Sequence, residues 1–178
     1  MNLRPLAEAD VDVLDRLEND PLAVGQHMWS GFHDPKMRRR RWEEDGCLGA
    51  SWSMLAIASP DGAMVGAVVW WPHDVVGPTG GCFELGCMVL PDFRGQGVAA
   101  RAQRALADYL FETTLANRIQ ALTDVDNQAE RRSLERAGFQ LEGILRGAGF
   151  LGGRWRDGAL YARLRDDPDT SGLPTPGA

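Results

Sequence analysis

The sequence predicts an α/β fold: a mixed sheet of about seven strands with helices on both faces. Seven apolar or alternating runs of strand length recur along the chain, bounded by turn residues or by helical segments. Segments with apolar residues at helical spacing follow the first, fourth and fifth of these runs. The last two runs adjoin directly around Gly152 and Gly153, which predicts a closing hairpin.

The chain is expected to begin with a short strand and two helices. Residues 2–6 predict the strand, and residues 8–18 predict a helix because Val11, Leu14 and Leu17 share one helical face. Residues 21–35 predict an irregular segment, and residues 35–44 predict the second helix, with Asp34 as its N-cap and Pro35 in its first turn.

Three strands are expected next, and they lead to the longest helix. They cover residues 52–58, 64–71 and 82–90, with turns at Asp61-Gly62 and at residues 78–81. A loop over residues 91–97 then opens a helix that ends near Thr114. The remaining elements are a strand over residues 118–123, a helix over residues 127–137 ended by Gly138, and strands over residues 139–150 and 154–164.

Composition indicates one globular domain over residues 1–165, followed by a Pro- and Gly-rich tail, residues 166–178, that we expect to be disordered. The net charge of −6 disfavours binding to nucleic acid or to an anionic membrane. No apolar run reaches the roughly 18 residues of a membrane helix, and the first five residues lack a signal-peptide core, so we expect a cytoplasmic protein. Cys47, Cys82 and Cys87 lack metal-ligand spacing, so no metal site is expected.

The loop Arg94-Gly95-Gln96-Gly97-Val98-Ala99 carries the clearest chemical signal. It joins an expected buried strand to the start of the longest helix. Glycines let backbone N–H groups converge on one point, and a helix N-terminus adds about half a positive charge. The loop therefore predicts a phosphate or pyrophosphate site, to which Arg94 can add charge-assisted hydrogen bonds.

A dinucleotide-binding fold is an alternative, because Gly95, Gly97 and Ala100 fit its Gly-x-Gly-x-x-Ala pattern and Asp124 follows the next strand. Two features oppose it. Residues 91–94 separate the first glycine from its strand, and the motif lies past the middle of the chain.

A linked set of motifs resembles the GNAT acetyltransferase superfamily, and within it the branch of bacterial ribosomal-protein serine and alanine N-acetyltransferases. The set comprises Arg94-x-x-Gly97-x-Ala99, Glu84-Leu85-Gly86, Asn127, Leu134-Glu135-Arg136-Ala137-Gly138-Phe139, Glu142-Gly143-Ile144-Leu145-Arg146 and Gly153-Arg154-Trp155-Arg156-Asp157. The resemblance spans residues 2–164 and implies the fold of that family. It also implies transfer of an acetyl group from acetyl-coenzyme A (acetyl-CoA) to a primary amine of a peptide N-terminus or a small molecule. A catalytically silent CoA-binding domain is the alternative.

The resemblance also assigns roles to residues. It places the pyrophosphate on residues 94–99 and the pantetheine arm beside Met88, Val89 and Leu90, with Asn127 in contact with that arm or with an active-site water. Glu84 is the candidate general base, and Asn127 is also an expected helix N-cap. The family's acids for the thiolate, a Tyr at position 134 or a Ser at position 130, are replaced here by Leu134 and Glu130. Ser133 is the candidate substitute, Tyr109 is a second one that also fits the apolar stripe of its helix, and water is the remaining alternative.

The resemblance also implies an acceptor pocket between the first helices and the closing hairpin. His27, Trp29, Phe32 and Trp155 are the candidates for its aromatic walls. The basic run Arg38–Arg41 is expected to form a solvated face with local ion pairs, and recognition of an acidic partner is the alternative. A monomer and a homodimer are both compatible with the sequence.

Overall fold

The computed structural model describes residues 2–28, 31–73 and 81–168. Its helices and strands follow in the expected order, with two short 3-10 turns at Glu8–Asp10 and Pro91–Phe93. The elements are β1 (Asn2–Arg4), α1 (Val11–Asn19), α2 (Pro21–Val24), α3 (Met37–Asp45), β2 (Ser53–Ala58), β3 (Met64–Pro72), β4 (Cys82–Val89), α4 (Val98–Thr113), β5 (Arg118–Asp124), α5 (Gln128–Arg136), β6 (Gln140–Leu151) and β7 (Arg154–Leu164).

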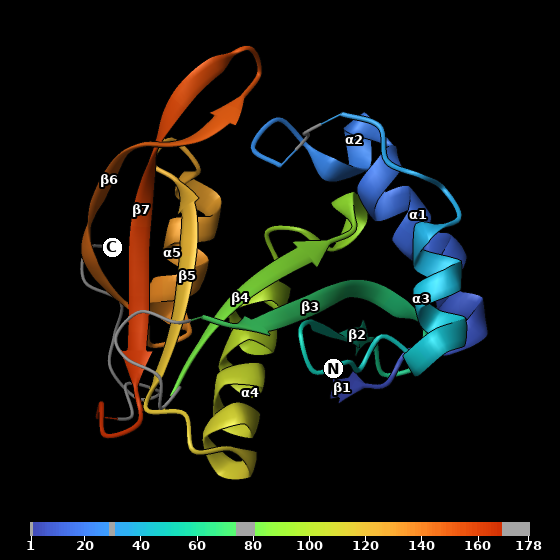
Figure 1. Cartoon of the computed structure of the whole chain (residues 1–178), viewed down its shortest axis with the longest axis horizontal. Helices are drawn as coiled ribbons and strands as arrows, with labels where there is room; N and C mark the ends of the chain where they lie inside the picture. Colours follow the sequence, from blue (N-terminus) through green and yellow to red (C-terminus); the bar gives the residue numbers. More distant parts are fainter. Residues whose placement is uncertain (1, 29–30, 74–80, 169–178) are drawn as a thin grey trace.

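The strands form one sheet in the order β1-β2-β3-β4-β5-β7-β6, which confirms the expected mixed sheet of seven strands (Figure 1). Among the described strands, β4 and β5 are the one parallel pair, and every other neighbouring pair is antiparallel. A dinucleotide-binding domain requires a mainly parallel sheet. That alternative is therefore wrong.

The parallel pair is short, and this shapes the middle of the molecule. Only Cys82–Glu84 of β4 pairs with Arg118–Gln120 of β5. Beyond Glu84 the two strands diverge, so the sheet opens like a V toward the carboxyl end of β4 (Figure 1). One edge of β4 is therefore left without a strand partner over its second half.

Helices cover both faces of the sheet, as expected. One core cluster packs α4 and α5 against one face, and it includes Leu85, Cys87 and Val89 of β4. A second cluster packs α1 and the α3 region against the other face, and it includes Met88. Because side chains of a strand alternate between faces, Glu84 lies on the same face as Met88.

Two local expectations differ from the structure. The segment expected to be irregular contains α2, because the Asp20 side chain accepts a hydrogen bond from Leu22 N and Pro21 opens the helix. Helix α3 begins at Met37 rather than at Pro35, because the Asp34 side chain accepts from Lys36 N and closes a turn first. The tail from residue 169 and most of the turn expected at residues 78–81 lie outside the described residues.

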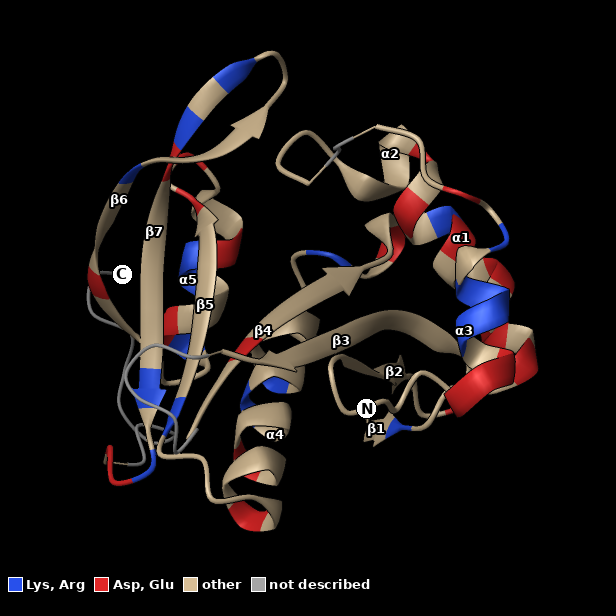
Figure 2. Ribbon diagram, viewed as in Figure 1, with Lys and Arg blue, Asp and Glu red and all other residues tan. Residues whose placement is uncertain are grey.

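The basic run forms ion pairs, but those of Arg40 and Arg41 alone are local as expected, and Arg38 and Arg39 pair with residues of the first helical region. Each of its four arginines meets a carboxylate, and the band of charge along α3 is visible in Figure 2. The pairs are Arg38 with Glu18, Arg39 with Glu8 and Asp12, Arg40 with Asp34, and Arg41 with Asp45. Among the described helices, none is long and apolar enough to cross a membrane.

Candidate functional site

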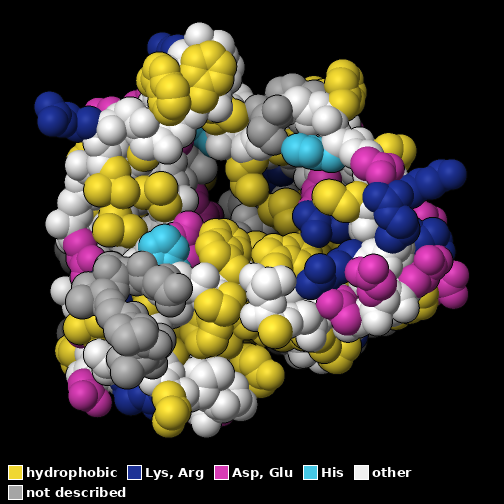
Figure 3. Space-filling view, viewed as in Figure 1, with side chains coloured by type: hydrophobic (Ala, Val, Ile, Leu, Met, Phe, Trp, Pro, Cys, Tyr) yellow, Lys and Arg dark blue, Asp and Glu magenta, His cyan; other side chains and the backbone are white. Residues whose placement is uncertain are grey.

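A cleft of about 340 Å³ occupies the opening between β4 and β5. Figure 3 shows the same face hollowed between the half that holds β5–β7 and the half that holds α1–α3. Three parts of the chain line the cleft: the end of α1 and residues 23–28, the end of β4 with the loop that follows, and the start of α5. Of the predicted catalytic and cofactor-binding residues, six line this cleft: Met88, Val89, Arg94, Ala99, Asn127 and Ser133.

The glycine loop has the conformation that a phosphate site needs. Gly95 and Gly97 have φ values of +73° and +71°, and Gly97 is the N-cap of α4 without a side-chain cap. The first N–H groups of α4 are therefore available to an anion. A small cavity of about 90 Å³ at this helix end shares Ala99, Ala129 and Ser133 with the cleft, so the two spaces adjoin.

Arg94 has a bracing role that the sequence did not reveal. Its side chain lines the cleft, but its Nε donates to Val89 O at 2.8 Å and its guanidinium also donates to Ala23 O. Arg94 thereby fastens α2 to the end of β4. Two neighbours shape the loop in the same way, since Gln96 donates to Asp92 O and Arg101 donates to Gln96 O.

Some of the other predicted cofactor-binding residues line the cleft, and others pack in the interior behind it. Met88 and Val89 line the cleft, as does Ala99. Val98, the first residue of α4, is buried in the core, and Leu90 donates its N–H to Val65 O. Val98 and Leu90 therefore set the position of the loop.

Glu84 lies at the point where β4 and β5 separate. It pairs in register with Gln120, whose Nε2 donates to Glu84 Oε2 at 2.9 Å, and His73 Nδ1 lies 3.4 Å from the same oxygen. The Glu84 side chain is 17% exposed. It is therefore held in place while one side remains open to solvent.

Asn127 and Ser133 both line the cleft and both have a structural partner. Asn127 Oδ1 accepts from Glu130 N at 3.3 Å, which confirms the expected N-cap. Ser133 Oγ donates to Gln103 Oε1 at 2.9 Å, and Gln103 in turn donates to Glu130. The hydroxyl proton of Ser133 is thus engaged with the buried Gln103.

Glu130 is the cleft residue that sequence reasoning missed. Burial raises the pKa of its carboxyl to about 7, while the hydrogen bond from Gln103 opposes that rise. The sequence contained two signals. Position 130 is one at which the resembling branch has a Ser acid, and Asn127-x-x-Glu130 at a helix start fits a structural capping box.

Loss of the Asn127 cap should destabilise the fold. Asn127→Ala leaves the Glu130 N–H without its partner, and we expect the free energy of unfolding to fall by about 1 kcal/mol. Urea unfolding without acetyl-CoA measures the change. Asn127→Ser, which can still cap, is the control. Its free energy of unfolding should lie between those of the wild type and Asn127→Ala. Equal stability of the Ala variant and the wild type would contradict the assignment.

Of the four residues proposed for aromatic walls, the three that the structure describes are not brought together. His27 lines the cleft, whereas Phe32 is 84% exposed. Trp155 is 70% exposed and meets Phe150 edge to face, with 5.5 Å between the ring centres. Trp29 lies outside the described residues. The Phe150–Trp155 pair lies on the β6–β7 hairpin, whose tip projects from the end of the sheet in Figure 1.

His27 takes part in a buried polar contact across the cleft. Its Nδ1 lies 3.5 Å from Asp124 Oδ2, and Arg156 lies 3.2 Å from the same oxygen. Burial raises the pKa of Asp124, but the Asp126 N–H together with His27 and Arg156 outweighs it and keeps the pKa below its ordinary value. The segment after α2 is thereby linked to the ends of β5 and β7.

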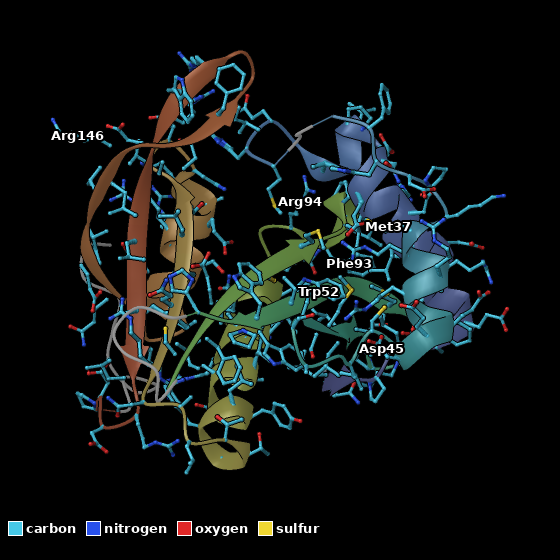
Figure 4. All side chains as sticks on the ribbon, viewed as in Figure 1. Met37, Asp45, Trp52, Phe93, Arg94 and Arg146 are labelled. Atoms are coloured by element: carbon cyan, nitrogen blue, oxygen red, sulfur yellow. The ribbon has the colours of Figure 1, made fainter. Side chains whose placement is uncertain are left out.

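A second cavity, of about 240 Å³, adjoins the cleft and shares Met28 and Met88 with it. Its other apolar walls include Met37, Trp52 and Val69. Met37 and Trp52, which line the second cavity, and Phe93 and Arg94, which line the cleft, are labelled in Figure 4. A polar edge comes from Glu18 and Arg38, where Arg38 stacks 4.6 Å from the Trp52 ring centre and binds both carboxylate oxygens.

The described residues contain no group of three or more His, Cys, Asp or Glu side chains placed to hold a metal ion.

Comparison with known proteins gives the same assignment as the geometry. The model of the acetyltransferase (GNAT) domain family matches residues 1–140. The ribosomal-protein-serine acetyltransferase of Escherichia coli is 34% identical over 83 residues, which are 47% of this chain and 46% of that protein. The matches to curated relatives thus span about half of their length.

Two solved structures share the fold. The spermidine N-acetyltransferase from Vibrio cholerae, in complex with CoA and spermine, has a TM-score of 0.79 at 18% identity and covers 93% of this chain and 96% of its own. The ribosomal L7/L12 alpha-N-protein acetyltransferase, in complex with CoA, has a TM-score of 0.77 at 23% identity and covers 93% and 94%. The family match extends over more than half of the sequence. The chain therefore belongs to the GNAT acetyltransferase family.

Proposed function

We propose that this protein transfers an acetyl group from acetyl-CoA directly to a primary amine. The observation that carries the proposal is the cleft in the opening between β4 and β5, which adjoins the uncapped N-terminus of α4 at one end. Both related structures described above contain CoA, which supports this choice of donor.

The donor fits the residues present. Backbone N–H groups over residues 95–99 would hold the pyrophosphate, because both glycines leave the approach open and the helix dipole favours an anion. The pantetheine arm would lie beside Met88 and Val89, where β4 has an edge without a strand partner. Its amide groups can pair with that edge as an added strand would.

The reaction needs a proton acceptor, because an amine at neutral pH is mostly an ammonium ion. Glu84 is the proposed base, and Gln120 orients it through the hydrogen bond to Oε2. Acetyl-CoA supplies the activated acyl group when bound. Glu84 lies on the face of the sheet that also carries Met88 and the second cavity, so we place the acceptor on this face.

The second cavity is the proposed binding site for the apolar part of the acceptor. Its volume suits a group of amino-acid side-chain size, and its walls are mainly Met, Val and Trp. Arg38 neutralises the one carboxylate at its edge, so a multiply charged polyamine finds no unpaired acidic site among the described wall residues. An amine with an apolar body, either a small molecule or a peptide N-terminus, fits this chemistry best.

Filling the second cavity tests where the acceptor binds. Met37→Trp should raise the KM for the acceptor about tenfold or more and leave the Kd for acetyl-CoA unchanged, because Met37 lines this cavity and not the cleft. Glu43→Trp, on an exposed position of the same helix, is the matched control. An unchanged acceptor KM in Met37→Trp would contradict the placement.

The reaction itself is tested with a panel of amines. Thiol release from acetyl-CoA is measured with short peptides that have free N-termini, apolar amino acids, amine-bearing antibiotics and spermidine, and products are identified by mass spectrometry. We expect turnover with apolar peptides or amines. Binding of acetyl-CoA without turnover of any amine would instead support the silent CoA-binding alternative. Activity only on internal lysines of folded proteins would contradict the proposed acceptor site.

A further inference from the structure

Glu130 places a carboxyl group inside the cleft that we propose for acetyl-CoA. Among the described residues that line this cleft, it is the one acidic side chain. Its position on α5 puts it on the face of the sheet covered by α4 and α5, opposite to the face that carries Glu84. The two carboxyl groups thus approach the opening from opposite sides.

Helix capping does not explain the orientation of Glu130. In an Asn-x-x-Glu capping box the glutamate would accept a hydrogen bond from the N-cap N–H. Here Asn127 N donates to Asp124 O at 2.9 Å, and the Glu130 carboxyl accepts from Gln103 Nε2 on α4. The side chain has turned away from its own helix end toward the cleft.

A buried relay fixes this orientation. Gln103 is fully buried, and its Oε1 accepts from Ser133 Oγ at 2.9 Å, so its amide nitrogen must point at Glu130. Gln103 binds Oε1 of the carboxyl, and no described residue hydrogen-bonds Oε2. One carboxyl oxygen is therefore held while the other is available to a group in the cleft.

The surroundings favour a carboxyl group that keeps its proton near neutral pH. Cys87 of β4, Asn127 and Ser133 of α5, and Gln103 of α4 are uncharged neighbours, and burial raises the pKa of Glu130 to about 7. Glu130 in turn contributes, after burial, to raising the pKa of the Cys87 thiol. Two basic side chains also line the cleft. Arg94 is held by backbone carbonyls and His27 lies next to Asp124.

We propose that Glu130 is the catalytic acid that protonates the departing thiolate of CoA. This role rests on the proposed acetyl transfer, in which the C–S bond breaks as the N–C bond forms. The acceptor ammonium loses two protons to Glu84 and from there to water. The sulfur gains one proton from Glu130, which is reprotonated by water, so that one proton is released per turnover. Ser133, the candidate acid from the sequence, acts here through Gln103 as a positioning residue.

The pH dependence of kcat/KM tests the role of Glu130. As pH rises through about 7 the acid loses its proton, so the wild-type profile should fall on its basic side. Glu130→Gln keeps an oxygen that can accept from Gln103, and it should lower kcat about 10²-fold and remove the basic limb. Glu130→Ser, which restores a hydroxyl donor, should recover part of the rate.

Three controls make the outcomes distinct. Glu112→Gln, an exposed position on α4, should retain the wild-type profile. Acetyl-CoA affinity and thermal unfolding show whether each variant is folded. Carbon-13 NMR of the side-chain carboxyls should show one group that titrates near pH 7 in the wild type and is absent in Glu130→Gln.

An active wild type with an unchanged profile in Glu130→Gln would overturn this role and leave the proposed acetyl transfer intact. If Glu130→Gln instead loses the acidic limb of the kcat/KM profile, Glu130 acts as a base and its role as the acid is overturned. A wild type that turns over no amine would refute the proposed function, and the role of Glu130 with it.

Discussion

Glu84→Gln is expected to lower turnover by about 10²- to 10⁴-fold while the affinity for acetyl-CoA stays the same. The substitution removes the proton acceptor but keeps an amide oxygen that can accept from Gln120 Nε2, so the local geometry survives. The loss should be largest at low pH, where most of the acceptor is protonated and needs a base. Stopped-time thiol-release assays over a range of pH measure it.

The pH dependence of the rate distinguishes the proposed roles of Glu84 and Glu130. Loss of the base affects the acidic side of the profile, and loss of the acid at Glu130 affects the basic side. Glu112→Gln serves as the control for both, because this glutamate is exposed and lies outside the residues that line the cleft. Equal rates of Glu84→Gln and the wild type at every pH would remove Glu84 from the mechanism.

Gly97→Val is expected to weaken acetyl-CoA binding by about 10²-fold or more, which corresponds to about 2.7 kcal/mol. Gly97 has a φ of +71°, and a Cβ atom there would lie 3.1 Å from an Arg101 nitrogen. A valine would therefore distort the loop and obstruct the N–H groups that we propose bind the pyrophosphate. Isothermal titration calorimetry measures the loss.

The matched control for backbone strain is Gly62→Val. Gly62 has a φ of +89° in the turn between β2 and β3 and has open space around it. Both variants should lose some thermal stability, because valine tolerates a positive φ poorly. Only Gly97→Val should lose acetyl-CoA affinity. Similar affinity in both variants would show that the loop is a structural turn without a role in binding.

Local signals in the sequence predicted much of this architecture. The glycines at 95 and 97, the cap at Asn127 and the left-handed Gly138, with φ of +92°, depend on neighbours close in sequence. The hydrogen bond from Phe139 N to Leu134 O completes that helix end. Short-range physics decides such features, so they can be predicted without knowledge of the fold.

Features set by long-range packing were not predicted. Glu130 has two competing partners, the nearby Asn127 N–H and Gln103, which lies 27 residues away, and the sequence pattern favours the first. The second cavity joins Met37 of α3 and Trp52, which precedes β2. Arg94 reaches Ala23 only because α2 packs over the end of β4. Each of these contacts depends on how distant elements meet.

The central claim is that acetyl-CoA binds in the cleft between β4 and β5. Calorimetric titration of acetyl-CoA into the wild type, in parallel with Gly97→Val and Gly62→Val, tests it most directly. Saturable binding at one site per chain is predicted for the wild type and Gly62→Val, with added stability of about 2.7 kcal/mol at 100 times the Kd. Absence of binding heat and of any thermal shift in the wild type would contradict the claim.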